Sequence, residues 1–246
     1  MSSERQEINV VSPWWGEHVH RYYEVLKYIK GNEVVLDIAC GTGFGSYLLS
    51  KATKSEVIGG DLSHEAIGLC NSKWKNSNLY FQNIDGANLS FADNYFDVVV
   101  SFETIEHTAE FNKMISEFKR VLKPNGFVFL STPNFIVNSP TGRVTNPFHT
   151  QEWAYEEFVE ILHSHFNVFC LYGQKYDRYG LNKPMGYYVE KLLYKRGLRK
   201  IPINIQDGIM KLFGQPSIYP LHSEFILVNE SEEIKKCKTF FAICQK

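Results

Sequence analysis

The 246-residue sequence predicts an α/β protein with a mostly parallel sheet and helices on both faces. Two observations support this fold class. Short, continuously apolar runs, typical of strands buried on both faces, alternate with stretches of helical periodicity. The run at 34–38 also passes directly into Gly41, Gly43 and Gly45. A backbone without Cβ atoms turns tightly there and comes close to a ligand.

Seven strands are expected, one for each apolar run, at residues 34–38, 56–60, 79–81, 98–101, 127–130, 168–172 and 239–244. Helical spacing of apolar residues predicts helices at 13–30, 46–51, 64–75, 111–122 and 150–162. A turn is expected at 123–126, where Pro and Gly follow a helix. The alternation stops after the sixth strand, so 174–235 is expected to be an insertion or cap before the last strand. We expect a single domain over 1–246.

Composition narrows the function classes. The formal net charge of −1 argues against a general nucleic-acid binder, which usually carries a basic excess. The five cysteines are odd in number and lack C-x-x-C spacing, which predicts reduced thiols in a cytosolic protein. The sequence contains no uninterrupted apolar span of about 18 residues, the length associated with a membrane helix. We therefore expect a cytoplasmic location.

The glycine loop distinguishes two ligand classes. A dinucleotide site uses G-x-G-x-x-G/A, but here Ser46 stands in the sixth position and the third glycine comes one residue early. Asp37 lies in the strand before the loop, where its carboxylate would repel a pyrophosphate and attract a cationic amino acid. The loop therefore favours S-adenosylmethionine, which carries an ammonium and a sulfonium, over a nicotinamide cofactor.

The stretch from Asp37 to Gly45 resembles the first motif of the class I, Rossmann-like S-adenosylmethionine-dependent methyltransferases. The resemblance covers roughly residues 20–173 and 237–246, with four motifs in the family's order. It implies a seventh strand that runs antiparallel beside the sixth. It also implies cofactor contacts in the loop at Asp37, Ala39, Gly41 and Gly43.

Further cofactor contacts are expected at the ends of later strands. Asp61 follows Gly43 by 18 residues, close to the spacing of a carboxylate that holds both ribose hydroxyls. The alternative for Asp61 is a turn residue. Leu62 would then flank the adenine. The stretch from Asp85 to Phe91 resembles the family's D-A-x-x-L-P-F pattern. This resemblance implies that Asp85 accepts from the adenine amino group and that Gly86 also contacts the cofactor. Ser101, at the end of the fourth strand, is a further candidate for cofactor binding.

The helix expected in 13–30 has two interpretations. It either packs its aromatic residues on the sheet or covers the cofactor and acceptor as a lid. In the resembling family, a His-Arg-Tyr run in this helix touches the methionyl part of the cofactor, which implies that role for Arg21 and Tyr22.

Two histidines are candidate general bases, because both follow strands at the carboxyl edge of the sheet, where ligands bind in open α/β sheets. His107 follows the fourth strand and His149 the fifth. The alternative for each is a neutral structural histidine bonded to backbone, which His107 fits better than His149. No metal is expected, because His18 and His20 lack the i, i+4 spacing that lets a helix share one ion, and the strand-end acids already have cofactor roles. A metal-dependent sugar methyltransferase is the alternative.

The sequence therefore predicts an enzyme, an S-adenosylmethionine-dependent methyltransferase (EC 2.1.1.-) that methylates an oxygen of a small acceptor. Residues 131–134 and 146–149 resemble methyltransferases of sugar pathways, within a group similar to the ubiquinone-biosynthesis enzymes. A sugar, or a nucleotide- or lipid-linked sugar, is the expected acceptor, and no nucleic acid is expected as a partner. The alternatives are a methyltransferase of the ubiquinone or menaquinone type acting on a phenolic polyprenyl substrate, and a catalytically silent cofactor-binding protein.

The insertion suggests a further contact. It carries many Tyr, and its cations include Arg178, Lys183, Lys191, Lys195, Arg196, Arg199, Lys200 and Lys211. Such a stretch would neutralise a diphosphate of the acceptor or touch an anionic lipid surface. A solvated or dimer-forming surface is the equal alternative.

Overall fold

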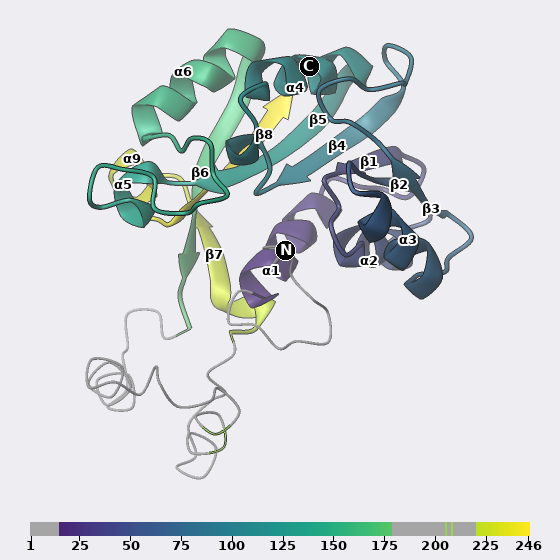
Figure 1. Cartoon of the computed structure of the whole chain (residues 1–246), viewed down its shortest axis with the longest axis horizontal. Helices are drawn as coiled ribbons and strands as arrows, with labels where there is room; N and C mark the ends of the chain where they lie inside the picture. Colours follow the sequence, from purple (N-terminus) through teal and green to yellow (C-terminus); the bar gives the residue numbers. More distant parts are fainter. Residues whose placement is uncertain (1–14, 179–204, 206–207, 209–219) are drawn as a thin grey trace.

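A computed structural model describes residues 15–178, 205, 208 and 220–246 (Figure 1). Its strands are β1 (Val34–Ile38), β2 (Glu56–Asp61), β3 (Leu79–Asn83), β4 (Phe96–Phe102), β5 (Leu122–Pro133), β6 (Val168–Tyr176), β7 (Phe225–Val228) and β8 (Thr239–Gln245). Its helices are α1 (Trp15–Leu26), α2 (Phe44–Ala52), α3 (His64–Lys73), α4 (Phe111–Val121), α5 (Phe135–Asn138), α6 (Tyr155–His165) and α9 (Ser231–Ile234), with short 3₁₀ turns η1 (Ile105–His107) and η3 (His222–Glu224).

All eight strands form one sheet in the order β3-β2-β1-β4-β5-β8-β6-β7. The first five pair in parallel, and β8 runs antiparallel between β5 and β6. The predicted α/β class and antiparallel last strand are confirmed. The predicted number of seven strands is wrong, because β7 pairs antiparallel with β6 at the edge. Its four apolar residues lie within the predicted insertion, where the surrounding polar and basic sequence hid them.

Helices cover both faces of the sheet (Figure 1). One buried cluster joins α4 and α6 to the sheet, with Phe118, Phe158 and Phe240 fully buried. The other cluster joins α1, α2 and α3 to the opposite face, through side chains that include Val25 and Leu49. The carboxyl edge between these layers is left for ligands.

Two local predictions need correction. The helix expected from Thr150 begins instead at Tyr155, because the Thr150 N–H and hydroxyl both donate to the backbone carbonyl of Glu106. The backbone N–H of Ala154, the N-cap, donates to the Glu157 carboxylate. The turn expected at 123–126 lies inside β5, where the pairing with β4 shifts register and Asn125 has a φ of 65°.

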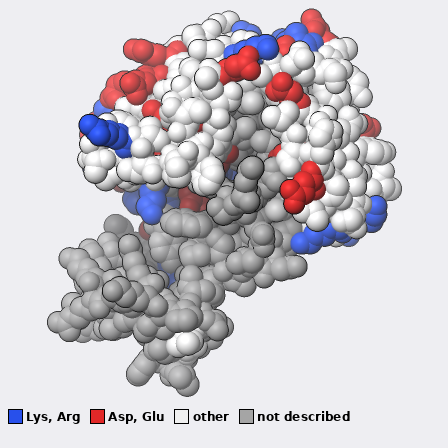
Figure 2. Space-filling model, in the orientation of Figure 1, with Lys and Arg blue, Asp and Glu red and all other residues white. Residues whose placement is uncertain are grey.

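Part of the predicted insertion lies outside the described residues. This part holds the seven cations from Lys183 to Lys211, and among the predicted cations only Arg178 is described. On the face shown in Figure 2, described acidic and basic residues are interspersed between neutral ones. Within the described ranges, no helix is both long enough and apolar enough to span a bilayer.

Candidate functional site

The loop after β1 has the backbone geometry that its glycines predict. Ala39, Gly41 and Gly43 have φ angles of 57°, 56° and 74°, which place all three in the left-handed region. A Cβ on Gly43 would lie 2.7 Å from the Cys70 sulfur, so α3 packs directly against the loop. At Gly45 a Cβ would lie 1.9 Å from the Tyr22 ring, which rests on the start of α2. The tight loop therefore depends on glycine at both positions.

Asp61 lies beside this loop at the end of β2. Its carboxylate accepts from the backbone N–H of Gly41 at 3.0 Å and from that of Ser63 at 2.9 Å. The side chain is fixed and 7% exposed, at the position that its spacing from the loop predicts. Leu62 next to it is 69% exposed, as a residue that flanks a ligand would be.

Three further residues that were predicted to contact the cofactor, Asp85, Gly86 and Ser101, lie at or near the ends of β3 and β4. Asp85 is exposed, and its carboxylate accepts from the Ala87 N–H at 2.9 Å. Gly86 is buried, and a Cβ there would lie 2.8 Å from the Met114 side chain. The hydroxyl of Ser101, within β4, is buried and has no hydrogen-bond partner in the structure.

Asp37 is buried at the end of β1 and held by two hydroxyls. Ser46 Oγ donates to it at 2.6 Å, and Tyr22 Oη lies 3.2 and 3.3 Å from its two oxygens. Burial raises the pKa of this carboxyl to about 7, while the hydrogen bonds from Ser46 and Tyr22 oppose the shift. Asp37 can therefore change its charge near neutral pH. It offers a carboxylate to a cationic ligand on the alkaline side of that value.

Arg21 lies at the centre of a buried polar network and is 1% exposed. Its Nε donates to Gln174 Oε1 at 2.8 Å, and its Nη1 donates to Glu103 Oε1 and Ser131 Oγ, both at 2.9 Å. Its Nη2 lies 3.3 Å from Glu17. The guanidinium thus ties α1 to the ends of β4, β5 and β6. The contact with the methionyl part of the cofactor that the resemblance implies stays a prediction for Arg21, as it does for Tyr22.

His149 belongs to a small buried network in the loop after β5. Its Nδ1 lies 2.7 Å from Glu152 Oε1, and its Nε2 accepts from the Asn146 amide at 2.9 Å. The second oxygen of Glu152 accepts from Ser139 Oγ at 2.8 Å. These partners assign the proton to Nδ1, and Glu152 is placed to stabilise a charged imidazolium.

His107 lies edge-on to His149, with 4.8 Å between ring centroids. Its Nδ1–H donates to the carbonyl of Phe148 at 3.0 Å, the kind of backbone bond that its structural interpretation predicts. Its Nε2 lies 4.0 Å from Glu106 Oε1. The structure therefore brings both predicted histidines together.

Glu106 is the group at this edge that sequence reasoning missed. It is fully buried, and its Oε2 accepts from Thr132 Oγ1 at 3.0 Å, whereas its Oε1 has no hydrogen-bond partner. Burial, and then the nearby Glu103, raise the pKa of Glu106 well above its usual range. One ligand atom from each of Glu106, His107 and His149 lies within 4.8 Å of the others. This set could hold a metal ion, a possibility that the spacing of His18 and His20 did not reveal.

The residues at the loop suit S-adenosylmethionine. The carboxyl groups of Asp37 and Asp61 have the chemistry that the predicted contacts to the ammonium and to the ribose diol require, and both contacts stay predictions. The unpaired hydroxyl of Ser101 lies in the adjacent strand. Nothing in this arrangement matches the G-x-G-x-x-G turn that a dinucleotide requires.

Comparison with known proteins supports the same interpretation. Residues 36–130 match the family model described as "Methyltransferase domain". The chain is 35% identical over 151 residues to a Mycolicibacterium smegmatis protein named "Probable S-adenosylmethionine-dependent methyltransferase/". The aligned residues cover 61% of this chain and 57% of that protein. It is 33% identical over 112 residues to a phthiotriol/phenolphthiotriol dimycocerosates methyltransferase of Mycobacterium tuberculosis, with 45% and 42% covered. The chain thus spans about half the length of these curated relatives.

A solved structure shares the fold. The S-adenosylmethionine-dependent methyltransferase from Archaeoglobus fulgidus superposes with a TM-score of 0.61 at 19% identity, over 94% of each chain. S-adenosyl-L-methionine is the family's cofactor. Residues 36–130 thus match a methyltransferase domain, the chain is similar in sequence to proteins named as S-adenosylmethionine-dependent methyltransferases, and it shares their Rossmann-like fold.

Proposed function

We propose that this protein transfers a methyl group from S-adenosylmethionine to a hydroxyl of a small acceptor. The observation that carries the proposal is the arrangement of the carboxyl edge. The glycine loop and Asp61 lie at the ends of β1 and β2, and the pair His107 and His149 follows the ends of β4 and β5. A cofactor site thus neighbours a site for proton transfer.

In this proposal the cofactor is held by the residues predicted for it. Asp37 faces its ammonium, and the loop backbone at Ala39, Gly41 and Gly43 lies against it. Asp61 takes the ribose hydroxyls. The adenine lies between Leu62 and Gly86 and donates to Asp85, while Ser101, Arg21 and Tyr22 line the methionyl side.

When bound, S-adenosylmethionine supplies a methyl group on a sulfonium, which leaves as a neutral thioether after attack by the acceptor oxygen. His149 takes the hydroxyl proton at Nε2, where the acceptor replaces the Asn146 amide. Glu152 keeps the proton on Nδ1 and stabilises the imidazolium. Such a base contributes roughly 10²–10⁴-fold, and holding the reactants in near-attack geometry contributes of the order of 7–11 kcal/mol.

For the acceptor we propose a sugar, or a nucleotide- or lipid-linked sugar. The support is the resemblance of residues 131–134 and 146–149 to sugar-pathway methyltransferases. The similarity to the phthiotriol/phenolphthiotriol dimycocerosates methyltransferase favours the lipid-linked form. In this proposal α1 acts as a lid, whereas most of the segment predicted as a cap lies outside the described residues. A lipid-linked acceptor would bring the protein into peripheral contact with a membrane. A phenolic polyprenyl acceptor, as in the ubiquinone-type enzymes, is the second candidate, because the cofactor motifs are common to both.

The test is a mass-spectrometric screen with methyl-labelled cofactor and three acceptor panels: nucleotide sugars, glycolipid precursors and polyprenyl phenols. We expect label in an oxygen of a sugar and release of S-adenosylhomocysteine. Label in a phenol alone would select the second candidate. Tight cofactor binding by calorimetry without turnover on any panel would identify a catalytically silent binding protein.

A further inference from the structure

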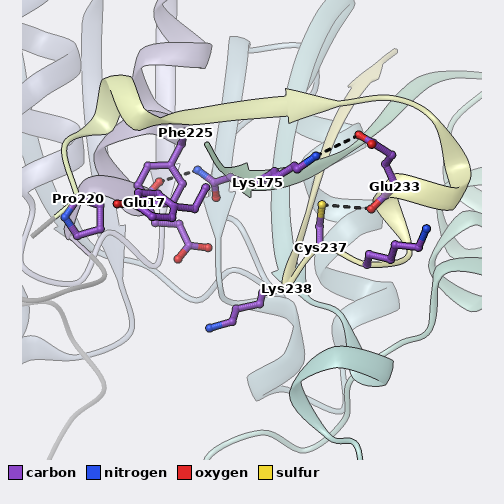
Figure 3. Close-up of a pocket in the computed structure, with 10 residues that line it drawn as sticks. Glu17, Lys175, Pro220, Phe225, Glu233, Cys237 and Lys238 are labelled. Carbon is purple, nitrogen blue, oxygen red and sulfur yellow. Dashed lines mark hydrogen bonds and ion pairs between the residues drawn. The ribbon is translucent and has the colours of Figure 1, made fainter. Parts of the chain in front are cut away.

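Beside the cofactor edge, the described residues enclose a cavity of about 500 Å³ (Figure 3). It lies at the carboxyl end of β6, between α1, β7 and the turn that follows α9. Its lining consists of Glu17, Gln174, Lys175, Tyr176, Pro220, Phe225, Glu233, Lys236, Cys237 and Lys238. The proposed function assigns none of these side chains to the cofactor or to the proton.

Two connections place the cavity next to the reaction edge. Gln174 lines the cavity and accepts from Arg21, which in turn donates to Glu103 at the end of β4. On the other side, the Asn134 amide at the end of β5 donates to the carbonyl of Cys237 at 2.9 Å. The cavity is therefore one side chain away from the ends of both strands.

The walls combine apolar and cationic side chains. Phe225, Pro220 and the ring of Tyr176 supply apolar surface, while Lys175, Lys236 and Lys238 are cationic. Two carboxylates, Glu17 and Glu233, also line the cavity.

Both carboxylates already lie beside cations. Glu233 is 3.5 Å from Lys175, and Glu17 is 3.3 Å from Arg21. Neither acid therefore offsets Lys236 at close range. In Figure 3, Lys175 and Glu233 meet across one end of the cavity, and Phe225 lies beside Glu17 at the other.

We propose that this cavity binds the non-reacting end of the acceptor, and that this end is an organic anion: a phosphate ester or carboxylate joined to an apolar group. The inference rests on the proposed function, since it names a chemical feature of that acceptor. The anion lies toward Lys236, and the apolar part packs on Phe225. Pockets that pair apolar walls with a few placed charges bind small ligands in this way.

The proposal is tested by calorimetry on the full chain with octyl phosphate and octanoate, which share an apolar chain and differ in the anion. Octyl glucoside is the neutral control, and inorganic phosphate lacks the apolar part. We expect an octyl anion to bind at least tenfold more tightly than either control, and its affinity to fall as salt rises. Lys236→Glu should weaken binding at least fivefold. Lys235→Glu changes a neighbouring lysine that pairs with Glu156 outside the cavity, and it should change binding less than twofold.

Equal binding by both variants, or equal binding of octyl glucoside, would overturn the inference. Tighter binding of octyl phosphate than of octanoate identifies the acceptor as a phosphate ester, and the opposite order identifies it as a carboxylate. Cofactor affinity and labelled turnover are measured on the same proteins. Anion binding that depends on Lys236, in a protein without turnover, would leave the cavity assignment intact and reject the proposed function. If no anion binds and both lysine variants turn over the acceptor with the same KM, the cavity assignment is rejected and the proposed function stands.

Discussion

The two sides of the carboxyl edge are held together differently. On the cofactor side, the bonds join residues close in sequence: Asp61 accepts from residues 20 and 2 positions away. On the side of β6 and β8, the bonds span most of the chain. Arg21 and Gln174 are 153 residues apart, and Thr239 donates to Glu17 across 222 residues.

The two sides should also respond differently to the replacement of a side chain. The cofactor-side acids Asp61 and Asp85 accept mainly from backbone N–H groups, so replacing one of them removes hydrogen bonds to neutral donors and not the partner of a buried cation. The other side depends on a buried guanidinium with two carboxylates around it. Replacing one side chain should therefore change affinity on the first side and stability on the second.

The largest effect is expected for Arg21→Ala. It leaves Glu17 and Glu103 without their buried cation, and breaking such a pair costs about 3–5 kcal/mol of folding free energy. Urea unfolding measures this loss. Arg143→Ala, at an exposed arginine, is the control and should stay within about 0.5 kcal/mol of wild type. A loss below about 1 kcal/mol for Arg21→Ala would show that both sides tolerate substitution alike.

Asp61→Ala should weaken S-adenosylmethionine binding strongly, because each charged hydrogen bond to the ribose contributes about 1.5–3 kcal/mol. Asp85→Ala should cost less, since one contact to adenine is removed. Calorimetry on the folded variants measures both. Unchanged affinity in Asp61→Ala would contradict the assignment of Asp61 to the ribose. It would also contradict the expectation that substitutions on the cofactor side change affinity.

His149→Ala should lower kcat at least tenfold and leave cofactor affinity nearly intact, because the base acts on the acceptor and not on the cofactor. His107→Ala should have a smaller effect. Steady-state kinetics from pH 6 to 9 with each variant decides this. If both variants keep wild-type kcat, positioning alone carries the reaction. Loss of wild-type activity in EDTA would instead point to an ion held by Glu106 and the two histidines.

The smallest effect concerns pH. The Asp37 pKa of about 7 means that the carboxyl is ionised above this value and neutral below it. A bound ammonium favours the ionised form, so cofactor affinity should fall by up to about tenfold as pH drops from 7.5 to 6. Asp37→Asn should bind more weakly with a flat profile. A wild-type profile that is equally flat would exclude this ion pair.

The raised pKa of Asp37 also makes the folding stability depend on pH, but in the opposite direction to cofactor affinity. The folded-state pKa of Asp37 lies above its unfolded value, so the folded protein holds the extra proton between about pH 4 and 7. The contribution of Asp37 to stability is therefore present below this window and is lost as pH rises through it.

Local sequence was enough to predict the strands and the glycine loop on the cofactor side. The apolar runs, the alternate glycines and the spacing to Asp61 each act within about 20 residues, so they remain visible without the fold. The strand β7 was missed because its partner β6 lies some 50 residues earlier in the chain, and pairing rather than its own four residues makes it a strand. Thr150 was misread as a helix start because its hydrogen bonds go to Glu106, 44 residues away.

The candidate site divides in the same way. Both histidines were predicted, but not that they meet, nor that Glu152 holds one of them. The three-residue spacing from His149 to Glu152 was a signal that could have been used. No comparable signal marked Arg21 as the centre of a network, because its partners come from three distant strands.

The Arg21 network has a consequence for how the chain folds as it is synthesised. The arginine emerges from the ribosome early, together with the residues of β1 and β2, whereas Gln174 and Thr239 emerge after most of the domain. Until then the guanidinium has no buried partners on that side and stays hydrated, since burying it uncompensated is costly. The buried contacts of Arg21 with β6 are therefore expected to form late in folding, after most of the chain has been synthesised.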